Sequence, residues 1–108
     1  MANARFSLDV SEPRERFEQL AQEWEEQTRF LSSVHQIAMN RAYQQIIGLG
    51  PAAVPLILER MRERPGHWFW ALQAITGEDP VATNHQGDVA AMTDDWLVWG
   101  RSRRLLSS

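Results

Sequence analysis

The sequence predicts an all-α protein, a compact bundle of five to six helices forming a single domain over residues 1–108. Three observations favour this fold. Apolar residues recur at helical spacing, and no segment alternates apolar and polar residues for long enough to indicate a strand. Gly and Pro divide residues 46–80 into short segments of helical length. The length fits one domain, and 44% hydrophobic residues suffice for one core.

A first amphipathic helix is expected over about residues 12–29. Ser11 has the side chain of an N-cap, and Pro13 would then lie early in the first turn, where proline is tolerated. The outer face is rich in glutamate, which suits either a solvated surface or an acidic docking face. The apolar stripe comprises Phe17, Leu20, Ala21, Trp24 and Thr28.

The next segments are short and have recognisable ends. We expect a bend at Ser32 and Ser33, either of which can cap a short helix after the bend. Asn40 is the expected N-cap of a helix over residues 41–47, and Gly48 should end it. Pro51 and Pro55 then favour a helix whose regular part begins at about Val54, because an internal proline removes a backbone hydrogen bond.

The C-terminal half contains two more expected helices. One covers residues 67–76 and ends at Gly77, and residues 81–87 form a loop. The other begins near Gly87 or Asp88 and ends at or just beyond Gly100. Residues 101–108 form a tail that either extends this helix or frays.

The order of these segments resembles HEAT-type helical hairpins. The motif consists of a short helix, Leu-Gly, Pro-Ala-Ala-Val-Pro-Leu-Ile-Leu, a break and Trp-Ala-Leu-Gln-Ala-Ile-Thr-Gly. The resemblance implies one hairpin over residues 41–63 and a looser one from 67 to about 100, so that 41–100 is a helical-hairpin core. Since such arrays need three or more units, the first helix would supply the missing neighbour.

Most of the chain also resembles a family of small, uncharacterised bacterial proteins with an all-helical fold. The resemblance rests on Trp24 with residues 28–33, and on residues 42–50, 67–72 and 75–80. It implies an architecture and no particular activity.

Composition narrows the classes of function. There is no cysteine, which removes disulfides and thiolate metal sites and makes the cytoplasm the expected compartment. No export signal or membrane-spanning segment is expected. All eleven basic residues are arginine, yet the net charge is −3, which disfavours nucleic acid as the main partner.

A search for catalytic or metal-binding patterns gives little. His35, His67 and His85 are not at metal-ligand spacing, so no metal or cofactor is expected. The pairs Glu78-Asp79 and Asp94-Asp95 are best explained as turn and surface residues. An enzyme would have to combine His67 or His85 with the first pair, and no nucleophile accompanies them; we therefore expect no enzymatic activity.

The aromatic run at residues 68–70 is the strongest functional signal. A short helix cannot bury all three rings on one stripe, so one of them, Trp70, should lie at an edge or an interface. The alternative is that Trp70 is buried beneath the loop at residues 81–87. Residues proposed as partner contacts are His67, Trp68, Trp70, Glu78 and Asp79.

The expected function is therefore a small non-enzymatic protein-binding module that docks stoichiometrically, such as an antitoxin, immunity protein or adaptor. A homodimer formed through the aromatic face is compatible with this function. The alternative is a nucleic-acid-binding helical-repeat protein, whose contacts would be Arg60, Arg62, Arg64, Arg101, Arg103 and Arg104.

Overall fold

The computed structural model describes residues 2–106 of the chain and the side chains of residues 13–106. Within this range there are six α-helices and two short 3₁₀ helices and no strand, which confirms the predicted all-α fold. The elements are α1 (Ala2–Thr28), α2 (Val34–Ala38), α3 (Arg41–Gly48), η1 (Gly50–Ala52), α4 (Ala53–Glu63), α5 (Phe69–Thr76), η2 (Thr83–His85) and α6 (Val89–Ser102).

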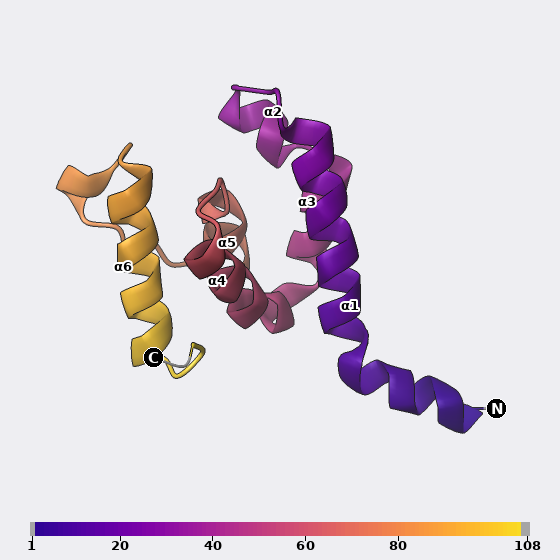
Figure 1. Ribbon diagram of the computed structural model, residues 1–108. Helices are drawn as coiled ribbons and strands as arrows, with labels where there is room; N and C mark the ends of the chain where they lie inside the picture. The colour runs from indigo at the N-terminus through magenta and orange to yellow at the C-terminus, as the bar shows by residue number, and fades with distance from the viewer. Residues whose placement is uncertain (1, 107–108) are drawn as a thin grey trace.

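The helices are arranged in three layers, as Figure 1 shows. Helices α1 and α3 lie on one side, α4 and α5 in the middle, and α6 on the other side. Helix α4 contacts both α1 and α6, whereas α3 packs chiefly on α1 and α5. The HEAT-like arrangement stays a prediction, since α3 and α4 each pack mainly on other helices.

The apolar stripe predicted for the first helix faces the core. All five of its residues are buried, and even the polar Thr28 is only 7% exposed because its hydroxyl donates to the Trp24 carbonyl at 2.7 Å. The Trp24 indole Nε1 donates to the carbonyl of Ile37 at 2.9 Å. This bond holds the five-residue helix α2 against the C-terminal part of α1.

The predicted start of the first helix is wrong. Helix α1 begins at Ala2, so Ser11 is not its N-cap and Pro13 lies inside it. A proline inside a helix removes one backbone hydrogen bond and bends the axis without having to end the helix. The ribbon of α1 is bent between its indigo N-terminal end and the remainder (Figure 1).

Most of the other predicted helix ends are confirmed. The side chains of Ser33 and Asn40 accept hydrogen bonds from backbone N–H groups in the first turns of α2 and α3. Helix α3 ends at Gly48 as expected, but Leu49 remains right-handed and the left-handed turn is made by Gly50, at φ 76°. A residue with a side chain rarely adopts that conformation, which explains a glycine at this place.

The second half follows the expected pattern closely. Helix α4 begins at Ala53, one residue before the predicted start, after the 3₁₀ turn that contains Pro51. Helix α5 ends at Gly77, which is left-handed at φ 72°. Asp88 caps α6 through a bond to its first turn, and α6 continues to Ser102.

Helices α4 and α6 are in close contact at Gly100. A Cβ atom at this position would lie 2.6 Å from Leu58 Cδ1, which is far closer than a van der Waals contact. Beyond α6 the chain turns back and buries Leu106 beside this contact. The predicted tail is therefore partly ordered, and residues 107–108 lie outside the described range.

Candidate partner-binding groove

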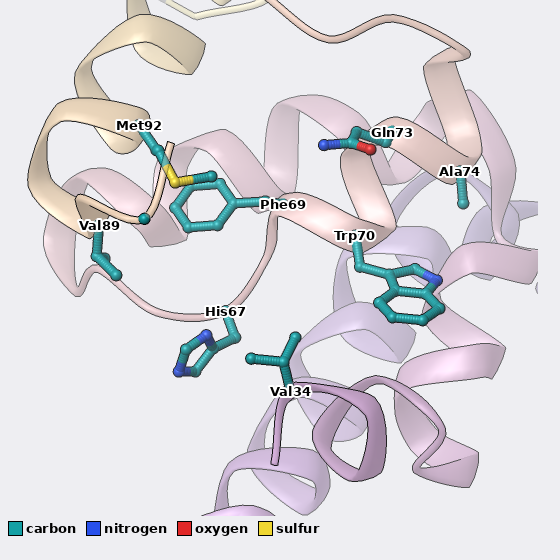
Figure 2. A pocket seen from close by; sticks show the side chains of 9 residues that line it. Val34, His67, Phe69, Trp70, Gln73, Ala74, Val89 and Met92 are labelled. Carbon is teal, nitrogen blue, oxygen red and sulfur yellow. The ribbon is translucent and has the colours of Figure 1, made fainter. Parts of the chain in front are cut away.

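An apolar groove runs between α2, α5 and the start of α6. Its volume is about 720 Å³, and Figure 2 shows the side chains that surround it. Helix α2 contributes one residue, α5 and the connector before it contribute five, and the other wall comes from residues 87–92. The lining residues are Val34, His67, Phe69, Trp70, Gln73, Ala74, Gly87, Val89 and Met92.

Trp70 gives the groove a large aromatic surface that is open to solvent. Its side chain is 40% exposed, and its ring meets the edge of His35 at a centroid distance of 6.1 Å. Val34 is 49% exposed and Val89 is 38% exposed on opposite walls. Large apolar side chains gathered in one hollow are unusual on a monomer surface and are typical of binding sites.

Trp68 lies on the opposite side of the same short segment. It is 1% exposed and is surrounded by other rings, with centroid distances of 4.5 Å to Trp24, 5.7 Å to Phe17 and 5.9 Å to Tyr43. The division between Trp68 and Trp70 agrees with the prediction that one ring of the aromatic run lies at an edge. Trp68 supports the groove from within the core and is not part of its surface.

The Tyr43 hydroxyl fixes the first turn of α5. It donates to the His67 carbonyl and accepts from the Ala71 N–H, each at 2.9 Å. These two backbone groups are four residues apart, so the hydroxyl lies where a direct helical hydrogen bond would otherwise form. Helix α5 has no side-chain N-cap, and Tyr43 supplies the missing partner from α3. Burial raises the pKa of Tyr43, so the hydroxyl keeps its proton and can donate.

The wall formed by residues 81–89 is attached to α6 by a histidine–aspartate pair. His85 Nδ1 lies 2.7 Å from Asp95 Oδ2, and the same oxygen accepts from the Ala82 N–H at 3.1 Å. Both bonds favour the ionised carboxylate, so the pKa of Asp95 is lowered, mainly by His85. Gly87, at φ 89°, then turns the chain into α6.

Besides Trp68, the predicted contact residues Glu78 and Asp79 also lie away from the groove lining. Glu78 accepts from Arg103 at 2.7 and 3.0 Å and from Trp99 Nε1 at 3.1 Å. These bonds lower the pKa of Glu78, with that from Arg103 the larger cause. Asp79 Oδ1 accepts from the Val81 N–H within its own turn. Of the five predicted contact residues, His67 and Trp70 line the groove.

Three arginines of the alternative function, Arg60, Arg64 and Arg103, form ion pairs, in two separate places. Arg60 binds both oxygens of Glu25, at 2.8 and 2.9 Å, and Glu18 at 2.7 Å, and these bonds raise its pKa. Arg64 lies 3.7 Å from Glu25, and Arg103 pairs with Glu78. The first pairs join α4 to the acidic face of α1, so part of that face is an internal contact.

Neither a metal cluster nor a membrane-spanning helix accompanies the groove in the described part of the chain. Among the side chains that the structure describes, those of residues 13–106, no three His, Asp or Glu residues gather as metal ligands would. None of the helices within residues 2–106 is long and apolar enough to cross a bilayer. Comparison of the chain with protein-family models, curated proteins and solved structures found no match. The site must therefore be interpreted from its own geometry.

The groove as a whole could not be predicted from the sequence, although the aromatic run that contributes to it was singled out. Val34, residues 67–74 and residues 87–92 belong to three separate segments, and periodicity does not reveal which segments meet. The pairing of His85 with Asp95 was missed for the same reason, since ten residues and a turn separate them. A signal was present in Val34 and Val89, since each is an apolar residue directly after a helix N-cap.

Proposed function

We propose that this protein is a small, non-enzymatic protein-binding module that docks stoichiometrically on its partner in the bacterial cytoplasm. An antitoxin, an immunity protein or an adaptor would act in this way. The observation that carries the proposal is the groove in which Trp70, 40% exposed, lies with Val34 and Val89.

The composition of the groove suits a macromolecular partner. Tryptophan is enriched among the residues that dominate binding energy, because a rigid indole buries a large area at small entropic cost. Apolar side chains surround it, and His67 and Gln73 offer polar groups at the lining. Apolar anchors with a few polar contacts are the ordinary anatomy of a protein interface.

A non-enzymatic function is supported by the surroundings of the only histidine–carboxylate pair among residues 13–106. His85 and Asp95 are bonded to each other, and Asp95 also binds the Ala82 backbone. Both residues thereby attach the loop to α6. The hydrogen bonds of this part of the chain do not connect His85 to a hydroxyl nucleophile, which acyl transfer would need.

The test compares three forms of the protein as bait in affinity capture from the native cell. Wild type should retain one partner at equal molar amount. Trp70→Ala should lose most of it, whereas Val98→Ala, which removes an apolar side chain exposed by 58% outside the groove, should retain it. Circular dichroism must show all three to be folded. Equal capture by the two variants would exclude the groove as the docking site.

A further inference from the structure

The segment that supplies most of the groove carries negative formal charges and no positive ones. Residues 65–100 supply all of the lining except Val34, and they contain no arginine or lysine. The same segment carries five carboxylates. These are Glu78, Asp79, Asp88, Asp94 and Asp95.

The carboxylate nearest to the groove is Asp88. It stands between Gly87 and Val89, which both line the groove, and it is exposed. Its Oδ1 accepts one hydrogen bond, from the Ala91 N–H at 3.1 Å, which leaves acceptor positions free. Asp94 is exposed on the same helix.

Internal pairing removes only part of this negative charge. Glu78 is paired with Arg103, and Asp95 with His85. Among the described side chains, no ion pair involves Asp79, Asp88 or Asp94. Asp88 therefore places a carboxylate outside any ion pair beside the groove, at the end formed by the loop and α6, and we call this end the acidic rim.

We propose that the groove takes a basic amphipathic helix of a partner protein, with apolar residues on one face and Arg or Lys along its edge. This inference rests on the proposed function and specifies the chemistry of the partner. The apolar face would cover Trp70, Val34 and Val89, and a basic residue would meet Asp88. Laying a helix in an apolar groove between helices is a common mode of recognition, and flanking charges then determine which partner is accepted.

A second copy of this chain fits the groove less well. In a two-fold dimer the same patch meets itself, so the interface would contain two copies of the acidic rim. Residues 65–100 offer no arginine to compensate, and the chain as a whole carries a net charge of −3. Opposed like charges disfavour association, so the acidic rim acts against self-association.

The experiment uses three fluorescein-labelled 18-residue peptides, each capped at both ends. All three carry the same leucine stripe at helical spacing. The remaining positions are mostly Lys in the first peptide, mostly Gln in the second and mostly Glu in the third. Fluorescence anisotropy with the full-length protein should give a Kd for the Lys peptide at least about thirtyfold lower than for the Glu peptide. Binding of the Lys peptide should also weaken when salt is added.

Variants locate the interaction. Asp88→Asn can still cap α6 while losing its charge, so it should weaken the Lys peptide about threefold and leave the Gln peptide unchanged. Glu15→Gln removes an equal charge from the exposed surface of α1, outside the groove, and should change neither. Trp70→Ala should lower the affinity for every peptide that binds the wild-type protein.

The outcomes separate the inference from the proposed function. Equal affinity for the three peptides, abolished by Trp70→Ala, would overturn the basic partner and leave the docking groove in place. If Asp88→Asn and Glu15→Gln lost equal affinity for the Lys peptide, the attraction would be non-specific and the inference would be overturned. No binding of any peptide at millimolar protein would count against both. Self-association that Trp70→Ala abolishes, measured by sedimentation, would make a second copy the occupant.

Discussion

Tyr43 shows how a single hydroxyl can set the position of a binding surface. Its two hydrogen bonds tie the His67 carbonyl and the Ala71 N–H to helix α3. Those two residues flank the aromatic run. The direction in which Trp70 leaves the helix therefore depends on a residue that does not line the groove.

Replacing Tyr43 by Phe should lower the free energy of unfolding by about 1–3 kcal/mol. The buried carbonyl and N–H lose a shared partner, and an unsatisfied buried polar group costs about that much. Urea denaturation followed by circular dichroism would measure the loss. The matched control is Trp70→Phe. It replaces a half-exposed ring and should lower the free energy of unfolding by less. If Tyr43→Phe were as stable as wild type, the hydroxyl bridge would have no structural role.

Asp95 should make stability depend on pH. Because its pKa is lowered in the folded protein, the unfolded chain takes up the proton at higher pH than the folded chain does. The stabilisation from Asp95 is therefore complete above the ordinary aspartate pKa of about 3.9, and it is lost as the pH falls through the lower folded value.

Asp95→Asn cannot ionise and should lose less stability than wild type between about pH 6 and pH 2.5. The asparagine oxygen can still accept from Ala82, so the loop retains one of its attachments. Thermal unfolding at several pH values would measure the difference, with Asp94→Asn as the control for removing an exposed charge. Parallel curves for wild type and Asp95→Asn would contradict the linkage.

At the scale of the helices, the contact between α4 and α6 depends on the missing side chain of Gly100. An added methyl group must displace the Leu58 side chain, which is fully buried. Overpacking of this kind costs about 1–3 kcal/mol, whereas alanine improves helix propensity by about 1 kcal/mol. We expect Gly100→Ala to destabilise the protein by up to about 2 kcal/mol.

The sign of this effect should reverse when Leu58 is truncated. Leu58→Ala alone costs about 2–5 kcal/mol, but it also empties the space that the new methyl group needs. Adding Gly100→Ala to that variant should then raise stability, because the propensity gain remains and the clash does not. A double-mutant cycle by urea denaturation provides the test. Additive effects would show that Gly100 and Leu58 are not in the close contact described.

Helix ends were largely predictable because they depend on neighbouring residues. Asn40, Asp88 and Gly77 end or begin helices through bonds and dihedral angles within a few residues of themselves. The start of α1 was missed because Pro13 bends a helix as readily as it opens one. It was also predictable that one ring of the aromatic run lies at an edge, since residues two apart in a helical segment do not share one face.

Contacts between distant segments were the part that sequence could not supply. Val34 lines the same groove as residues of α5 and α6 because other helices hold α2 in place, through Trp24 on the Ile37 carbonyl and Gln44 on the Ala38 carbonyl. Likewise, arginines 60 and 64 lie beside Glu25 of α1, although they resemble a free basic cluster in the sequence. Such pairings arise from tertiary packing and not from local spacing.

At the scale of the whole molecule, the distribution of charge predicts weak binding to nucleic acid. Several arginines of the alternative function are held by carboxylates, and residues 65–100 are acidic. A short DNA or RNA duplex should therefore not be retarded in a gel shift even at about 50 mM salt, where phosphate contacts are strong. Retardation that is lost in Arg101→Gln would revive the nucleic-acid function.

Helix α5 is only eight residues long, and it belongs to the core and to the groove at once. Leu72 and Ala71 are buried on one face, while Trp70 and Gln73 stand on the other. Helix α5 cannot move without disturbing the packing beneath it, so the wall that carries Trp70 is in place before any partner arrives. Little conformational entropy is then lost by this protein on association, and the ordering cost falls on the segment that it receives.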